Sequence, residues 1–377
     1  MRLRSPRVAG RRRSPGRRRV LFFGTYDARK YPRVRVLQEG FEALGDEVLE
    51  CNAPLGLDTA MRVRIVRHPW LAPVLAVRLL TAWTRLWWRS RRVPVIDLVV
   101  VGYMGHFDVH LARRLFPGVP VALDHLVSGS DTAQDRGVGG RFVLRLLERI
   151  DRAALRAADH PCVDTVEHLS LVAAEAHGRA LVVPVGAPDE WFHEPDAESS
   201  ATLSVVFFGS YTPLQGAPVI GEAIALLRTE APEISFTMIG RGQDYDATRD
   251  AGARNDRVRW LDWVEPEELP ALVARMDACL GIFGTGPKAL RVVPNKVFQG
   301  AAAGAAIVTS DTGPQREALG DAALYVPPGD ARALADALLA LAADHERLHE
   351  LRVAAYERAC AHFRPASVVA PLHALVA

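Results

Sequence analysis

The stretch SVVFFGSYTPLQG, Ser204–Gly216, decides the fold. An apolar run of strand length ends at Gly209, and a helix is predicted from about Ala217 to Thr229. A glycine directly after a strand lets a ligand approach the backbone, and the helix that follows offers its first amide groups to an anion. The stretch therefore predicts one unit of an α/β domain that binds a ligand at the carboxyl ends of its strands.

The same alternation of strand-like and helix-like segments continues on both sides of this unit. A polar, proline-containing stretch at residues 188–202 interrupts it once. We therefore predict an α/β protein with two doubly wound, Rossmann-like domains, 20–187 and 203–360, which face each other across a cleft. A C-terminal helix within 361–377 is expected to pack back on the first domain. The predicted strands are residues 19–26, 46–52, 95–103, 120–126, 160–165, 180–186, 204–211, 234–242, 258–264, 278–284, 305–311 and 323–330.

Composition excludes several classes of protein. The chain has 377 residues, of which 49% are hydrophobic, which suits two ordinary cores. Its four cysteines form no C-x-x-C pair, so neither a disulfide framework nor a structural zinc site is indicated, and a reducing, cytoplasmic compartment is expected. The G-x-G-x-x-G and P-loop motifs are both missing from the sequence, which argues against a nicotinamide dinucleotide site and a P-loop phosphate site.

Residues 1–19 hold nine arginines and no acid. Such a run cannot bury apolar surface, so a disordered tail is predicted. Its role is either electrostatic attachment to anionic lipid or nucleic acid, or none, as a dispensable extension. A signal peptide is disfavoured because the apolar run VLFFG that follows is short and Asp27 comes soon after it.

Residues 61–92 hold eight arginines and four of the seven tryptophans, with no acid between Asp58 and Asp97. A basic helix with tryptophan and leucine on one face is typical of a segment that lies in a membrane interface, and this one is too short in apolar length to span a bilayer. The alternative is a helix packed on the first domain with a solvated basic rim. The residues predicted to contact the membrane are Arg62, Arg64, Trp70, Trp83, Trp87 and Trp88.

Two of the three lysines in the chain, Lys288 and Lys296, flank a predicted helix start at Pro294 and Asn295. Helix amides, the positive end of the helix dipole and two ammonium groups would suit a diphosphate without a metal ion. The alternative is that both lysines are ordinary exposed residues. No metal and no cofactor are predicted.

Several motifs resemble glycosyltransferase family 4, a group of retaining enzymes with the GT-B fold. In the second half these are FFGSYTPLQG (207–216), MIGRGQD (238–244), PNKVFQGAAAG (294–304) and ALYVPPGD (323–330), similar to the family's nucleotide-sugar-binding domain. In the first half, FFGTYDARKYPRVRVLQEG (22–40) and VVVGYMGHFDV (99–109) are also similar to it. The resemblance covers most of the chain, excluding the arginine-rich tail and residues 61–92.

The resemblance implies a donor site and marks departures from the family pattern. The family's Arg and Lys after the first strand of this domain correspond here to Ser210 and Gln215, and its two glutamates correspond to Arg291 and Gln299. A branch with a P-x-K run matches PNK and moves the basic charge to Lys296. The residues predicted to bind the donor are Gly209, Ser210, Gly240, Lys288, Asn295, Lys296 and Gln299.

In the first domain, His106 resembles the histidine that the family places near the donor sugar, and we take it as the candidate catalytic residue. A histidine after a strand is otherwise a capping or packing residue. Asp131 and Asp135 could bind acceptor hydroxyl groups or cap the next helix. The loop after the first strand could meet an acceptor phosphate. The residues predicted to bind the acceptor are Gly24, Thr25, Tyr26, Arg33, Asp131 and Asp135.

These features predict a peripheral membrane glycosyltransferase at the inner face of the plasma membrane. It would move a sugar with retention from a nucleotide diphosphate sugar to a cell-envelope polysaccharide or lipid-linked glycan, with no nucleic-acid partner. The alternatives are a catalytically inactive GT-B-like binding protein, which the departures at Ser210, Gln215 and Gln299 would favour, and a GT-B nucleotide-sugar epimerase.

Overall fold

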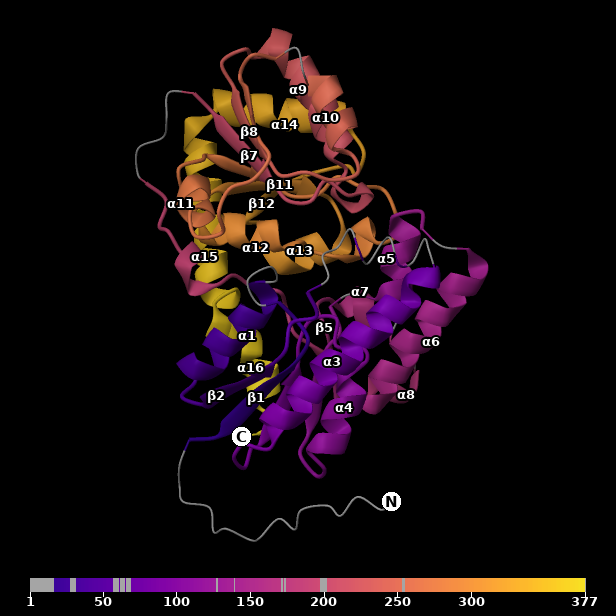
Figure 1. The fold of residues 1–377 in the computed structure, drawn as a ribbon. Helices are drawn as coiled ribbons and strands as arrows, with labels where there is room; N and C mark the ends of the chain where they lie inside the picture. The colour runs from indigo at the N-terminus through magenta and orange to yellow at the C-terminus, as the bar shows by residue number, and fades with distance from the viewer. Residues whose placement is uncertain are drawn as a thin grey trace, which may run out of the picture.

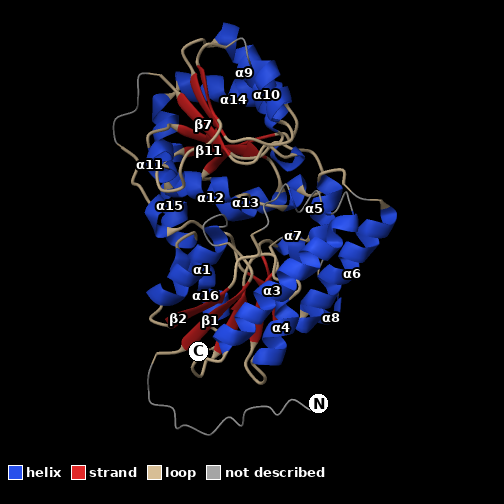
Figure 2. Cartoon of the chain, in the orientation of Figure 1, coloured by secondary structure: helices blue, strands red, loops and turns tan. Residues whose placement is uncertain are grey.

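A computed structural model of the chain contains two parallel β-sheets, each covered by helices on both faces (Figures 1 and 2). It describes residues 17–27, 32–56, 61, 65, 69–126, 128–138, 140–170, 172, 174–196, 202–252 and 255–376. The predicted tail therefore lies largely outside the described residues, as do Arg62 and Arg64. Within the described ranges, none of the helices combines the length and apolar character that a bilayer crossing requires.

The first sheet has the strand order β2-β1-β3-β4-β5-β6. Its strands are β1 (Arg19–Gly24), β2 (Glu47–Asn52), β3 (Leu98–Val101), β4 (Val121–Asp124), β5 (His160–Val163) and β6 (Leu181–Val182). The second sheet has the order β12-β11-β10-β7-β8-β9. Its strands are β7 (Ser204–Phe208), β8 (Ser235–Ile239), β9 (Val258–Leu261), β10 (Ala278–Leu280), β11 (Ala306–Ser310) and β12 (Ala323–Val326).

Alternate residues of β1 belong to two different hydrophobic cores of the first domain, one on each face of the sheet. Val20 and Phe22 pack with α1 (Pro32–Ala43) and α16 (Pro365–His373). Leu21 and Phe23 pack with the opposite layer, which consists of α3 (Ala72–Ser90), α4 (Asp108–Leu115) and α6 (Arg141–Ala157). A strand that is buried on both faces must be apolar throughout, which is why VLFF reads as a continuous run rather than an alternating one.

The second domain is built in the same way. One face of its sheet packs against α9 (Ala217–Glu230), α10 (Tyr245–Gly252) and α14 (Ala331–Ala343). The other face packs against α12 (Asn295–Ala302) and α15 (His345–His362). The shorter helices are α5 (Gly129–Asp135), α7 (Val166–Leu169), α8 (Ala174–His177), α11 (Leu269–Ala274) and α13 (Gly313–Leu319), and the 3-10 turns are η1 (Pro69–Leu71), η2 (Asp189–Trp191), η3 (Pro213–Gln215) and η4 (Ala289–Arg291).

The described part of the predicted linker is packed rather than free. Trp191 is buried and stacks on Phe208 of β7, with 5.6 Å between the ring centroids. The backbone amide of His193 donates to the carbonyl oxygen of Ala302. Trp191 and His193 therefore hold this segment on the second domain, whereas Asp189 and Glu190 contact Glu39 and Arg35 of α1. Residues 197–201 lie outside the described residues.

The last helix returns to the first domain. Val368 and Val369 of α16 belong to the core of that domain. A Cβ atom at Gly40 of α1 would overlap the backbone of Pro365, so glycine is what lets the two helices approach this closely. The chain ends packed on the domain in which its described part begins.

The predicted GT-B-type α/β architecture is confirmed, and each predicted strand is present with shorter bounds. The stretch 278–284, for example, contributes only Ala278–Leu280 to its sheet. Residues 281–284 are buried and form a loop instead, because the backbone leaves the ladder before the apolar run ends. Apolar runs predict burial, and burial extends past the last paired residue.

Candidate functional site

Loops from both sheets meet where the two domains touch. Lys288 donates from its ammonium to the hydroxyl of Thr132 at 2.8 Å, and Arg291 pairs with the carboxylate of Asp131 at 2.7 Å. The hydroxyl of Thr165 also donates to the carbonyl oxygen of Arg291 at 2.9 Å. These contacts connect η4 of the second domain to α5 and to the loop after β5 of the first.

Two glycines shape the loops after β7 and β8. Gly209 has φ 146° and Gly240 has φ 112°, in the backbone region that favours glycine. A Cβ atom on Gly240 would overlap the carbonyl oxygen of Gly209. The two loops touch backbone to backbone, so both positions require glycine.

Lys296 lies beside this pair of loops, in the first turn of α12. It is 3% exposed, and its Nζ atom is 2.5 Å from Oε1 of Gln215 and 3.4 Å from the ring centroid of Phe207. A Cβ atom built on Gly209 would be 3.2 Å from the same Nζ atom. The ammonium therefore lies at the end of β7, beside the loop that contains Ser210 and Gln215.

The charge of Lys296 is poorly compensated in the chain itself. Burial holds its pKa well below the usual range for lysine. Among the described residues it has one hydrogen-bond acceptor, the amide oxygen of Gln215, and one aromatic face. An ammonium group has three donors, so an anion that reached this position would satisfy it.

Lys288 is placed differently from the prediction of a two-lysine diphosphate site. Its ammonium reaches across the domain interface to Thr132. Burial lowers the pKa of Lys288, and the carboxylates of Asp131 and Asp135 oppose that shift. The structure therefore uses Lys288 as an interdomain contact, because the loop between β10 and α12 extends toward α5.

The remaining predicted donor residues lie around the start of α12. Asn295 is half-buried at the first helical position, Gln299 is buried one turn later, and Ser210 is exposed. The sequence did not single out three further polar side chains near the end of β11. Buried atoms without a hydrogen-bond partner among the described residues occur there on Ser310, Thr312 and Gln315. The only local signal for them is that polar residues follow directly on a buried strand.

His106 of the first domain pairs with Asp151 of α6, with 3.0 Å between Nε2 and Oδ1. Asp151 also accepts hydrogen bonds from the Ser128 hydroxyl at 2.7 Å and from the backbone amides of Gly129 and Ser130. Burial alone would raise the pKa of this carboxyl group, but His106 and Ser128 hold it below the ordinary value. Asp151 is therefore a fixed carboxylate that orients the imidazole.

His125 follows β4 and lies edge-on to His106, with 5.0 Å between the ring centroids. Burial lowers the pKa of His125 to about 3, and the neighbouring charge of His106 acts in the same direction. His125 is therefore neutral at physiological pH. The potential ligand atoms of His106, His125 and Asp151 lie within 4.8 Å of one another, so among the residues that the structure describes these three side chains are the group that could hold a metal ion. The Asp151 oxygens already accept hydrogen bonds from Ser128, Gly129 and Ser130, so the arrangement as it stands is a carboxylate that this turn holds beside His106 rather than a ligand set.

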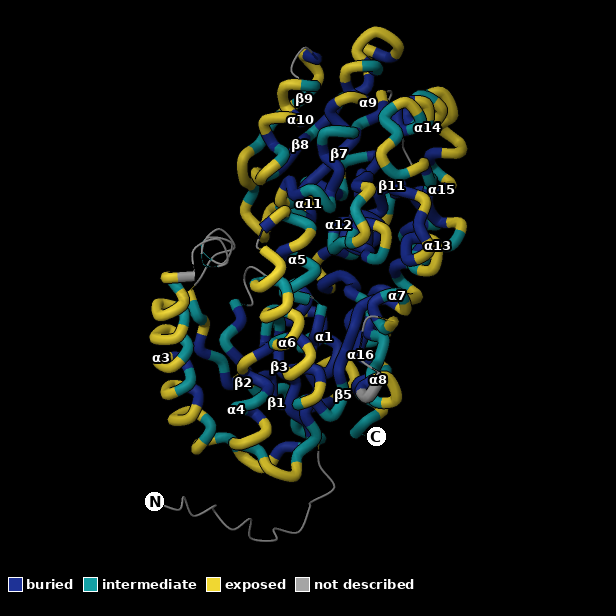
Figure 3. The backbone as a smooth tube through the Cα atoms, turned by 90° about the vertical axis from the view of Figure 1, so that its right-hand side faces the viewer, coloured by how far each residue is buried: buried dark blue, intermediate teal, exposed yellow. Residues whose placement is uncertain are grey.

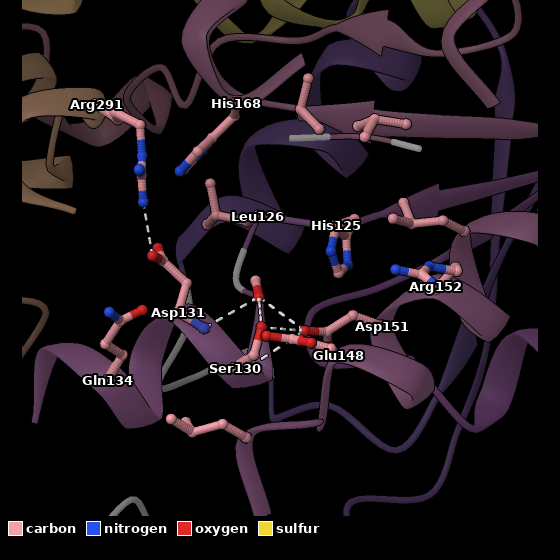
Figure 4. Close-up of a pocket in the computed structure, with 15 residues that line it drawn as sticks. His125, Leu126, Ser130, Asp131, Gln134, Glu148, Asp151, Arg152, His168 and Arg291 are labelled. Atoms are coloured by element: carbon pink, nitrogen blue, oxygen red, sulfur yellow. Dashed lines mark hydrogen bonds and ion pairs between the residues drawn. The ribbon is translucent and has the colours of Figure 1, made fainter. Parts of the chain in front are cut away.

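A cavity of about 410 Å³ opens next to this pair (Figure 4). Arg291 and Asp131 lie on one side of it, and His125, Arg152 and Asp151 lie on the other. The sequence predicted Asp131 here but did not single out the helix α6 or His168, whose imidazole pairs with Asp164. The full lining is His125, Leu126, Ser128, Ser130, Asp131, Gln134, Leu144, Glu148, Asp151, Arg152, Leu155, Val163, His168, Val172 and Arg291.

Several predicted acceptor residues are used inside the first domain instead. Arg33 is 1% exposed, pairs with Asp124 at 3.0 Å and donates to the carbonyl oxygens of Val183 and Pro184. Its predicted contact with an acceptor phosphate is wrong, because the guanidinium is already satisfied in the core. Asp135 is half-buried and does not line the cavity.

The loop after β1 is also held by internal contacts. The amide and hydroxyl groups of Thr25 both donate to Asp108 at 2.8 Å, and the hydroxyl of Tyr26 donates to Glu50 at 2.8 Å. Gly24 has φ 149° and lies against Asp108 and Tyr26. Burial raises the pKa of Tyr26, so its hydroxyl stays protonated.

The tryptophans of the predicted membrane segment have two different environments. Trp70, Trp87 and Trp88 are exposed. Trp83 is half-buried, and its indole N–H donates to Asp108 at 2.9 Å. The prediction that Trp83 contacts a membrane is wrong, because it faces the domain and not the solvent.

The family described as Glycosyl transferases group 1 matches residues 202–344. The chain is 29% identical over 141 residues to a phosphatidyl-myo-inositol mannosyltransferase of Mycobacterium leprae (strain TN), and the match covers 37% of each chain. It is also 29% identical over 146 residues to the protein of the same name from Mycolicibacterium smegmatis (strain ATCC 700084 / mc(2)155), with 38% of this chain and 37% of the relative covered. The matches thus span well under half the length of either relative.

Solved structures match almost the whole chain. Sucrose-phosphate synthase from Thermosynechococcus elongatus has a TM-score of 0.73 at 16% identity, covering 95% of this chain and 98% of that one. Anabaena Alr3699/HepE in complex with UDP-glucose has a TM-score of 0.67 at 13% identity, covering 95% and 99%. With the two sheets and the return of α16, these likenesses establish the architecture. The chain therefore has the two-domain architecture of the GT-B fold, and its residues 202–344 match the family described as Glycosyl transferases group 1.

Proposed function

We propose that the protein transfers a sugar, with retention and without a metal ion or other cofactor, from a nucleotide diphosphate sugar to a cell-envelope polysaccharide or lipid-linked glycan. The observation that carries the proposal is Lys296, a buried ammonium group with a single hydrogen-bond acceptor beside the glycine loops after β7 and β8. A diphosphate at those loops would bring the compensating charge that the chain lacks there.

Residues of both domains would contribute to the reaction. Lys296 and the amide end of α12 would hold the diphosphate, with Asn295 and Gln299 on the same helix. His106, fixed by Asp151, would lie near the donor sugar. The bond from the sugar's anomeric carbon to the diphosphate would break, the acceptor oxygen would bond to that carbon, and the acceptor proton would pass to the departing diphosphate.

One solved structure and two mycobacterial relatives support the choice of substrate classes. The complex of Alr3699/HepE contains UDP-glucose, a nucleotide diphosphate sugar. The mycobacterial relatives are named for a phosphatidyl-myo-inositol acceptor, which is a lipid. The cavity beside Asp131 and Asp151 is the proposed acceptor site, and the exposed Trp70, Trp87 and Trp88 are the proposed contact with the inner face of the plasma membrane.

The decisive experiment is a thermal-shift and hydrolysis screen of the full chain against a panel of nucleotide sugars. A ligand present at a hundred times its Kd stabilises the folded state by about 2.7 kcal/mol. We expect Lys296→Met, which keeps most of the buried volume, to abolish the shift. Lys288→Met is the matched control and should keep it, because Lys288 contacts Thr132.

A catalytically inactive binding protein is the second candidate. The observation in its favour is that a glutamine, Gln299, is buried where the family resemblance places a glutamate. It predicts a thermal shift without sugar release from any donor. A screen in which no nucleotide shifts the unfolding temperature would exclude the donor site itself.

A further inference from the structure

The outer face of α6 carries a row of arginines that the proposed reaction does not use. Arg141, Arg145 and Arg149 follow one another at spacings of four residues, which places them on one side of the helix. All three are exposed, and Figure 3 shows α6 as a largely exposed helix. We call these three residues the α6 arginine stripe. We propose that this stripe, with Phe142 and Leu146, docks the first domain on an anionic lipid surface.

The stripe differs from the other exposed arginines in lacking acidic partners. Arg35 pairs with Glu39 and Glu190, and Arg332 pairs with Glu230 and Asp336. Among the described residues, no ion pair joins Arg141, Arg145 or Arg149 to an acid. The sole acid on an exposed position of α6 is Glu148, which follows Arg145 by three residues at the edge of the stripe, lines the cavity and pairs with none of these arginines. Positive charge on this face is therefore left for an external anion.

The arrangement also works against the stability of the helix. Arginines four residues apart repel each other, and each such pair destabilises a helix by about 0.2–0.5 kcal/mol. Arg141 stands at the first helical position, where the helix dipole disfavours a cation. A row of unpaired arginines that opposes its own helix is better explained by a partner than by folding.

Two apolar side chains decide which kind of partner fits. Phe142 is 79% exposed, more than any other large apolar side chain among the described residues, and Leu146 is 48% exposed. Each directly follows an arginine in the sequence, so the two form an apolar row along one edge of the stripe. Phosphate groups of a nucleic acid would pair with the arginines and leave these two in water. A lipid interface accommodates the arginines and the two apolar side chains together. Its headgroups bind the guanidinium groups, and its acyl boundary accepts the phenyl and isobutyl groups.

The side of α6 that adjoins the stripe faces the cavity. Leu144, Asp151 and Leu155 line the cavity from the same helix. The exposed tryptophans of α3 belong to the same layer of helices, which covers one face of the first sheet (Figure 1). Docking through α6 would therefore hold the cavity close to the headgroups. This surface is separate from α3 and does not depend on sugar transfer.

The test is flotation of the full chain with vesicles made of equal parts phosphatidylglycerol and phosphatidylcholine. R141Q/R145Q/R149Q removes three charges without touching Arg152, which lines the cavity. Since each arginine near an anionic surface contributes about 1 kcal/mol, we expect affinity to fall on the order of 100-fold. The control R316Q/R332Q/R347Q removes three exposed charges from the second domain and should bind as the unaltered chain does.

A second variant, F142S/L146S, tests the apolar contribution and should weaken binding while its salt dependence persists. Unfolding of both variants is measured alongside, and the arginine variant should be no less stable than the unaltered chain. Undiminished vesicle binding by R141Q/R145Q/R149Q would overturn the proposal. So would tighter binding to duplex DNA than to the vesicles, with the same loss in the variant.

Nucleotide-sugar thermal shifts of the arginine variant separate this inference from the proposed function. They should match those of the unaltered chain, because the donor loops lie in the other domain. A chain that floats through α6 but binds no nucleotide sugar would support the surface and refute the donor site. The reverse result would refute the surface alone.

Discussion

The two lysines near the start of α12 show how far a residue's role depends on its surroundings. Lys296 points into the second domain and meets Gln215 and Phe207, whereas Lys288 reaches the first domain and meets Thr132. They are eight residues apart and equally rare in type. Their scarcity correctly marks the region, but only the path of the loop separates an anion site from an interdomain contact.

Arg33 gives a stability prediction at the residue scale. Its guanidinium and the Asp124 carboxylate are each 1% exposed, so removing the cation would leave an uncompensated buried charge. We expect Arg33→Met to reduce the free energy of unfolding by about 3–5 kcal/mol. Arg35→Met, which breaks exposed pairs two residues away, should cost less than about 1 kcal/mol. Denaturant titration measures both, and equal losses would contradict the buried ion pair.

His125 gives a prediction about pH. Its pKa is lowered from 6.5 to about 3 in the folded chain, so between these values the unfolded chain binds a proton that the folded chain does not. Stability should therefore fall as the pH drops below 6.5, with His125 contributing up to about 1.4 kcal/mol per pH unit. His125→Phe should flatten this slope, whereas His345→Phe, on an exposed helix start, should not. A slope that is the same in His125→Phe as in the unaltered chain would show that His125 is protonated in the folded state.

At the scale of elements, the loops after β7 and β8 contact each other backbone to backbone at Gly209 and Gly240. Gly240→Ala would place a methyl group against the Gly209 carbonyl and force alanine to φ 112°. We expect a loss of about 2 kcal/mol or more in stability and the disappearance of the nucleotide thermal shift. Gly140→Ala is the control, because nothing lies within 4 Å of its Cβ position, and it should change stability by less than about 0.5 kcal/mol. Retained nucleotide binding in Gly240→Ala would mean that the donor does not use this pair of loops.

The helix α3 shows the limit of composition as a guide to an element. Its basic and aromatic character is visible in the sequence, and most of its surface is exposed, since only Ala82 and Leu86 are buried. The side on which each tryptophan lies follows from where the helix rests on the sheet. Trp83 therefore binds Asp108 while Trp87 and Trp88 face solvent.

At the scale of the whole molecule, the domains are joined by polar contacts that a single substitution can weaken. Asp131→Asn removes the ion pair with Arg291, which is 26% exposed and lies at the domain interface. We expect about 1 kcal/mol less interdomain stabilisation and a measurably larger radius of gyration in small-angle X-ray scattering. Asp336→Asn, which breaks an exposed pair within α14 of the second domain, is the control and should leave the radius unchanged. An unchanged radius in Asp131→Asn would show that other contacts hold the domains together.

The sequence by itself determined the architecture. Every strand of both sheets could be located because a strand buried on both faces must be a continuous apolar run, and the motifs around Gly209, Gly240 and PNK mark the second domain. The glycines, Lys296 and His106 could be singled out because each lies at the end of a strand or the start of a helix. Such local signals depend only on residues that are neighbours in the sequence.

Only the tertiary structure decided which groups act together. Asp151 lies 45 residues from His106, within an arginine-rich helix, and nothing beside it in the chain identifies it as the partner of that histidine. Arg33 looks like a free loop cation until β4 brings Asp124 against it. Lys296 becomes the neighbour of Gly209 only when α12 packs next to β7. Spacing along the chain fixes which residues share an element, but contacts between elements, and the burial that shifts pKa values, arise from packing.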